Sequence, residues 1–69
     1  MIITEEEIEF LLDEYKMSRR EQFARHANKK EMNYFLGMSR GLEVALIKLG
    51  VLNTTLDEIT QEAYHEVMK

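Results

Sequence analysis

The fold of this chain is decided by residues 32–49, which read MNYFLGMSRGLEVALIKL. Apolar side chains recur there every three or four residues, the spacing that places them on one face of an α-helix. That face carries Phe35, Met38, Leu42, Ala45, Leu46 and Leu49, whereas Leu36, Val44 and Ile47 lie on a different side. Because a helix with two apolar sides needs two neighbours, this stretch predicts an all-α fold in which each apolar side of the helix packs against a different neighbour.

A first helix begins near residue 5, where Thr4 and Glu7 form a capping-box pattern before apolar residues at helical spacing. The sequence leaves two alternatives for the end of this helix. One lies near residue 17, where Ser18 could cap a new helix, and the other near residue 28, where Asn28 could adopt the left-handed conformation. The later break gives two arms of similar length, so we favour an antiparallel hairpin with helices near 5–28 and 30–49.

A short third helix is expected near 55–68, after the stop signal of Gly50 and a capping box formed by Thr55 and Glu58. No repeat or linker divides the chain, so residues 1–69 form a single small helical domain. The expected core comprises Ile8, Leu11, Leu12, Tyr15, Phe35, Met38, Leu42, Ala45, Leu46, Leu49, Leu56, Ile59, Ala63 and Val67.

The small size of the chain favours a homodimer, which would assemble as a helical bundle. A domain of 69 residues buries only about 60% of its unfolded surface, so such domains are usually reinforced. With no cysteine and two histidines, neither disulfides nor a usual structural zinc site provide that reinforcement. Small residues at helical spacing indicate close approach of a neighbouring helix, in the same chain or a second one, or else a kink. The predicted self-association residues are Leu36, Gly37, Gly41, Val44, Ala45 and Ile47.

The net charge of −4 is distributed in blocks. Residues 1–15 carry six acids and no base, whereas residues 16–30 carry six bases and one acid. We predict that an unidentified protein partner binds the basic end of the hairpin, through Arg19, Arg20, Phe23, Lys29 and Lys30. Two alternatives stay open for segment 16–30, namely nucleic-acid binding and a purely solvated surface, and the acidic block admits phosphate mimicry.

Nothing in the sequence assembles a nucleophile, a base and an oxyanion donor, so we expect no enzyme. Glu62 and His65 have the Glu-x-x-His spacing of di-iron bundles, but their position beside the buried edge of the third helix favours surface residues. We therefore expect no metal and no cofactor. Neither a secretory signal nor a membrane-spanning run is visible, so a cytoplasmic protein is expected.

Residues 34–43, which read YFLGMSRGLE, resemble short helical proteins encoded by phages and prophages of Gram-positive bacteria. The resemblance covers about a third of the chain and contains no functional motif. It implies an accessory or inhibitor protein that binds a host protein. A structural subunit of a larger assembly is the other interpretation that the sequence leaves open.

Overall fold

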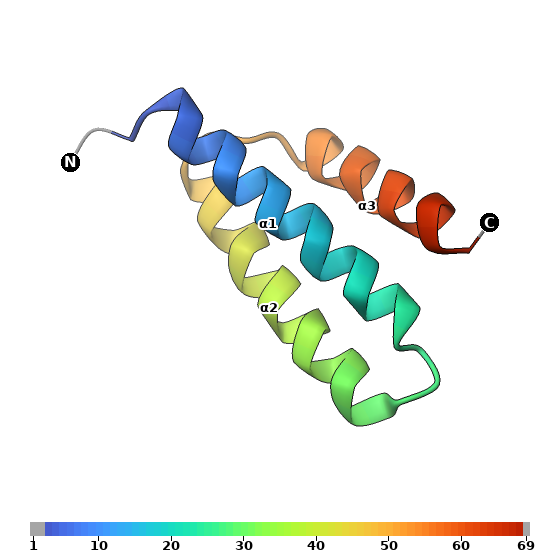
Figure 1. Cartoon of the computed structure of the whole chain (residues 1–69). Coiled ribbons are helices and arrows are strands. Elements are labelled where there is room, and N and C mark those ends of the chain that lie inside the picture. The colour runs from blue at the N-terminus through green and yellow to red at the C-terminus, as the bar shows by residue number, and fades with distance from the viewer. Residues whose placement is uncertain (1–2, 69) are drawn as a thin grey trace.

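The computed structural model describes residues 3–68 and contains three helices, α1 (Glu5–Ala24), α2 (Lys29–Lys48) and α3 (Asn53–Val67). Figure 1 shows α1 and α2 as an antiparallel hairpin, with α3 lying along the other side of α1. Helix α1 packs against both other helices, whereas α2 and α3 make only marginal contact. The all-α class and the hairpin are thus confirmed, and the helix with two neighbours inside this chain is α1. Covering of α2 by the third helix is wrong, whereas covering by a second subunit stays a prediction.

The turn of the hairpin lies near the later of the two predicted breaks, although α1 ends at Ala24, before the expected residue 28. Asn28 is not in the left-handed conformation, because its φ and ψ are −111° and 98°. It acts as the N-cap of α2, where its side-chain oxygen accepts a hydrogen bond of 3.2 Å from the backbone N–H of Glu31. Arg25 holds the same end together through ion pairs with Glu21 and Glu31.

Two helix ends follow the sequence signals and one does not. Thr4 Oγ1 accepts from the Glu7 N–H at 3.2 Å, as a capping residue should. Gly50, with φ of +97°, ends α2 in a Schellman motif, in which the Val51 N–H donates to the Leu46 carbonyl at 3.0 Å. The capping box at Thr55 is wrong, because α3 already begins at Asn53, after Leu52 as an N-cap without a side-chain hydrogen bond.

The core lies where the three helices meet. Tyr15, Leu46 and Leu56 form its buried cluster, and Ala63 is also buried. Packed against the cluster are Ile8, Leu11, Leu12, Leu42, Val51 and Ile59. Ala45 is exposed and its prediction as a core residue is wrong. It immediately precedes the buried Leu46, and successive helical residues point about 100° apart.

Candidate interaction surfaces

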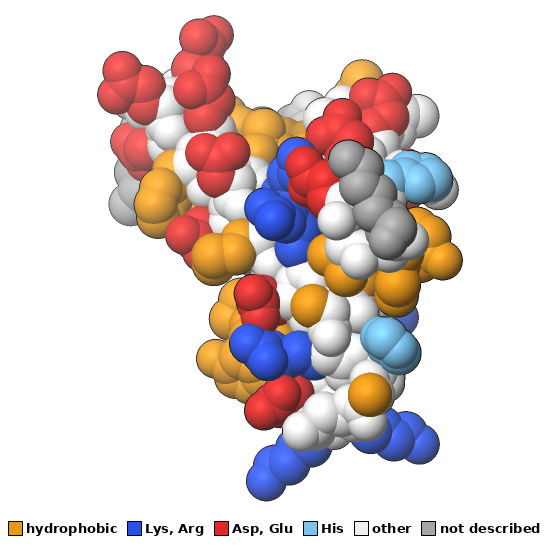
Figure 2. Space-filling model, turned by 45° about the vertical axis from the view of Figure 1, so that its right-hand side comes forward, with side chains coloured by type: hydrophobic (Ala, Val, Ile, Leu, Met, Phe, Trp, Pro, Cys, Tyr) orange, Lys and Arg blue, Asp and Glu red, His pale blue; other side chains and the backbone are white. Residues whose placement is uncertain are grey.

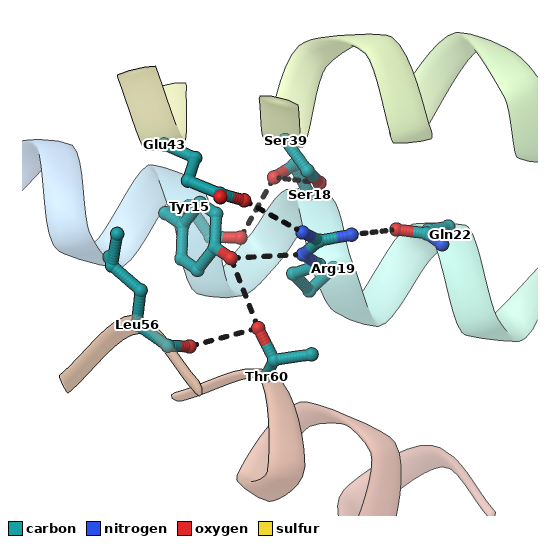
Figure 3. Close-up of polar contacts among 8 residues, drawn as sticks. All are labelled: Tyr15, Ser18, Arg19, Gln22, Ser39, Glu43, Leu56 and Thr60. Atoms are coloured by element: carbon teal, nitrogen blue, oxygen red, sulfur yellow. Dashed lines mark hydrogen bonds and ion pairs between the residues drawn. The ribbon is translucent and has the colours of Figure 1, made fainter. Parts of the chain in front are cut away.

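A polar network links the three helices at the centre of the molecule (Figure 3). The Tyr15 hydroxyl lies 3.0 Å from Thr60 Oγ1, and Thr60 in turn donates to the Leu56 carbonyl at 2.9 Å. Because the Thr60 proton is used there, the Tyr15 hydroxyl is the donor to Thr60. Its oxygen accepts from Arg19 Nε at 3.1 Å. The network therefore has one consistent arrangement of protons across this set of hydrogen bonds.

The second polar contact of the core is a pair of buried serines, Ser18 of α1 and Ser39 of α2, both 0% exposed. Their hydroxyl oxygens are 2.8 Å apart, and Ser18 also donates to the Tyr15 carbonyl at 2.8 Å. Since Ser18 uses its proton on that carbonyl, Ser39 donates to Ser18. The pair lets the two helices approach closely, because each residue adds little more than a hydroxyl to the interface.

Three of the five predicted partner-binding residues contact other helices of their own chain. The Arg19 side chain is only 13% exposed and pairs with Glu43 of α2 at 3.2 Å. Arg20 pairs with Glu66 of α3 at 3.6 Å. Phe23 packs edge-on against Tyr64, with ring centroids 5.4 Å apart. These side chains help to position α2 and α3 on α1, a role that the sequence spacing did not reveal.

The other two predicted residues, Lys29 and Lys30, are exposed at the beginning of α2. No ion pair within residues 3–68 involves either of them. The structure thus separates them from Arg19, which lies in the interior of the network. Partner binding by the five residues stays a prediction.

Lys16 belongs to the same basic segment and is also engaged by α3. Its ammonium lies 3.3 Å from Glu66 and 3.4 Å from Glu62. The hydrogen bond to Glu66, supported by Glu62, raises the pKa of Lys16 above the ordinary value of 10.5. Glu62 is therefore a partner of a lysine on α1, and within residues 3–68 no group of three or more metal-ligating side chains comes together.

The outer side of α2 is defined by the six predicted self-association residues, of which five are exposed and Leu36 is half-buried. Val44 is 54% exposed and Ile47 is 40% exposed. A Cβ atom added at Gly37 or Gly41 would meet nothing within 4 Å. The interpretation of these glycines as a close contact within the chain is therefore wrong. Close approach of a second chain stays a prediction.

Helix α1 presents a further exposed apolar surface that the sequence analysis missed. Phe10 is 62% exposed and Met17 is 48% exposed. Exposed Ala24 continues the spacing of seven residues between them. The sequence contains this spacing of seven residues. It was overlooked because the apolar stripe formed by Ile8, Leu11, Leu12 and Tyr15 is the stronger pattern in the same helix.

Comparison with protein-family models, with curated proteins and with solved structures finds no match for this chain. In the part of the chain that the structure describes, no helix has the length and apolar character needed to cross a membrane. The geometry of the surfaces is therefore the basis for a functional interpretation.

Proposed function

We propose that this protein is a small, non-enzymatic protein-interaction module that works as a homodimer, in which the outer side of α2 forms the contact between subunits. The observation that carries the proposal is the pair of glycines in α2. Each glycine within a helix costs about 1 kcal/mol relative to alanine. Within residues 3–68 no packing contact offsets that cost at Gly37 or Gly41, since both are exposed and an added Cβ would meet nothing within 4 Å. Close packing of a second helix would offset it.

The residues around the glycines support the same contact. Exposed Val44 and Ile47 and half-buried Leu36 give the outer side of α2 an apolar character. Burying exposed apolar area stabilises an assembly by roughly 25 cal/mol per Å². A dimer would give this small domain the additional buried area that its own core does not supply.

In this proposal the module acts by occupying a surface of another protein, as an accessory or inhibitor protein would. The dimer presents α1 and the hairpin end for that purpose, because both lie outside the α2 contact. Lys29 and Lys30 stay predicted contributors to partner binding, since they are exposed and have no ion-pair partner within residues 3–68.

The glycines offer a sharp test, because alanine should affect the monomer and the dimer in opposite directions. In the monomer both positions are exposed, so Gly37→Ala together with Gly41→Ala should raise the free energy of unfolding by about 1–2 kcal/mol. In the dimer the two methyl groups prevent close approach, so we expect the dissociation constant to rise at least about tenfold, equivalent to 1.4 kcal/mol.

Sedimentation equilibrium over a range of concentrations measures the dissociation constant of the dimer. Urea unfolding of dilute protein measures the free energy of unfolding of the monomer. Gln61→Ala, an exposed change on α3, is the matched control and should leave dimerisation unchanged. A wild-type chain that stays monomeric at millimolar concentration would contradict the proposed dimer. Unchanged dimerisation of the double-alanine variant would show that the subunits meet elsewhere.

A further inference from the structure

The outward direction of the apolar residues on α1 follows from their neighbours. Lys16 contacts α3 and Ser18 contacts α2. Met17 lies between them in the sequence and points about 100° away from each, which directs it away from both helices. Phe10 and Ala24 are seven residues before and after Met17, so the three side chains share one side of the helix. None of them is part of the buried core.

Acidic side chains surround Phe10, the first residue of this apolar line. The positions three and four residues from Phe10 on either side are its neighbours on the helix surface. All four are acidic, namely Glu6, Glu7, Asp13 and Glu14. Glu21 follows Met17 by four residues and is therefore a neighbour of Met17 on the helix surface, as Glu14 is of Phe10. We call Phe10, Met17 and Ala24, together with these five carboxylates, the acidic stripe.

Much of the charge of the acidic stripe is not neutralised by the protein itself. No ion pair within the described residues 3–68 involves Glu6, Asp13 or Glu14. In Figure 2 acidic side chains gather, with hydrophobic ones beside them, at the end of the molecule where α1 begins. Like charges one helical turn apart are destabilising, and exposed Phe10 adds apolar surface to the same place. A ligand that is both cationic and apolar would offset both costs.

The surface is also hollowed beside its two largest apolar side chains. An open depression of about 530 Å³ lies at Phe10, lined also by Thr4, Glu6, Glu7 and Leu11. A second depression, of about 250 Å³, lies at Met17 and Ala24, between Arg20, Glu21 and Val67. Arg20 is paired with Glu66 of α3 and Glu21 with Arg25, so the unpaired carboxylates of the stripe lie in the first half of α1, around Phe10. Phe10 lines the first depression and Met17 the second, and these two residues are about two helical turns apart along α1.

We infer that the acidic stripe is the docking surface for a cationic amphipathic helix of a partner protein. Apolar residues on one face of that helix would fill the depressions at Phe10 and Met17, as anchors do in helix-in-groove recognition. Lysine or arginine residues flanking them would meet the carboxylates on both edges. The distance from Phe10 to Ala24 along α1 is about 21 Å, which accommodates about four turns of a partner helix. The inference rests on the proposed function as a protein-interaction module and identifies the chemistry of the partner.

A synthetic peptide of about 21 residues, with leucine at the first and fourth positions of each heptad and lysine flanking them, is a direct probe. Titration into the isotope-labelled full chain, followed by NMR, should give saturable chemical-shift changes concentrated at Phe10, Met17 and Ala24. Phe10→Ser with Met17→Ser should weaken binding at least about tenfold without changing any charge, because the apolar contacts are lost. Far-UV circular dichroism establishes that each variant keeps its helices.

The electrostatic half of the inference has a matched control within the chain. Asp13 and Glu14 are adjacent in the stripe, and Asp57 with Glu58 repeats the same pair on α3. Neither pair takes part in an ion pair within the described region. Reversing both charges at 13 and 14 to lysine should weaken peptide binding about tenfold or more, whereas the same change at 57 and 58 should alter it only about twofold.

Several results would overturn the inference. Equal binding of a peptide with serine in place of every leucine would show general attraction between charges and no docking site. Shifts centred on α2, or equal losses from the two charge-reversed variants, would place the peptide elsewhere. Dissociation of the homodimer by changes at Phe10 and Met17 would assign the stripe to a second copy of this chain. A wild type that binds the peptide yet stays monomeric would uphold this inference and contradict only the proposed dimer.

Discussion

The pair of buried serines between α1 and α2 leads to a prediction in which two single substitutions are worse than the double one. Ser39 donates to Ser18, and Ser18 donates to the Tyr15 carbonyl. Ser18→Ala removes the acceptor of Ser39 and leaves a hydroxyl that is 0% exposed without its partner in α1. Ser39→Ala removes one hydrogen bond but leaves Ser18 bonded to its carbonyl, so it should be the milder change.

The expected changes in the free energy of unfolding follow from the complete burial of both serines. An unsatisfied buried donor costs about 1–3 kcal/mol, and the loss of one ordinary hydrogen bond costs about 0.5–1.5 kcal/mol. In the double alanine variant each CH2OH side chain becomes CH3, so no hydroxyl is left unpaired and each substitution removes a single oxygen atom. Removing both partners of a buried hydrogen bond can be nearly neutral, because no donor is left unsatisfied, so we expect the double variant to lie within about 0.5 kcal/mol of the wild type.

Urea unfolding followed by circular dichroism measures the four members of this cycle at one fixed protein concentration, because a dimer makes stability concentration-dependent. With a slope of about 1 kcal/mol per molar urea, Ser18→Ala should lower the midpoint by roughly 1–3 M, and Ser39→Ala by less. The double variant should recover most of the loss. Additive costs in the double variant would refute the reasoning, because they would mean that the two hydroxyls do not depend on each other.

Two further predictions concern a turn and an ion pair. Gly50→Ala places a Cβ at a φ of +97°, so it should cost about 1–2 kcal/mol and lower the melting temperature by several degrees in calorimetry; an unchanged temperature would contradict the Schellman geometry. Because Glu66 and then Glu62 raise the pKa of Lys16, their ion pairs stabilise the fold below the unfolded-state value of 10.5 and are lost as pH rises through the higher folded-state value. Wild type should therefore lose stability relative to Lys16→Met over that alkaline range in urea unfolding, and parallel pH profiles for the two proteins would contradict the role of the ion pairs.

The parts of the fold that could be predicted from the sequence depend on local interactions. The cap at Thr4 and the stop at Gly50 involve residues within one or two turns of each other, and their patterns are visible in a short window. The burial of Tyr15 and Leu56 follows from helical periodicity in the same way. The position of Asn28 was found but its role was reversed, because asparagine favours both the end and the beginning of a helix.

The arrangement of the helices depends on pairs that are far apart in the sequence. Lys16 meets Glu62 and Glu66 across about 50 residues, and Tyr15 meets Thr60 over a similar separation. Neither pair leaves a periodic signal, so the central position of α1 was not predictable. For the same reason Arg19 looked like an exposed base in the sequence, whereas its pairing with Glu43 draws it into the interior.

The distribution of ion pairs explains why the surface charge differs from what the blocks in the sequence suggest. The bases at Lys16, Arg19 and Arg20 meet acids of α2 and α3, so the most basic segment is largely neutralised by folding. The acids in the first half of α1 take part in no ion pair within residues 3–68. Folding therefore converts a chain with a basic centre into a molecule whose most distinctive exposed surface is acidic and apolar. Since opposite charge guides encounter and excludes wrong partners, that surface should select a cationic protein helix and repel nucleic acid.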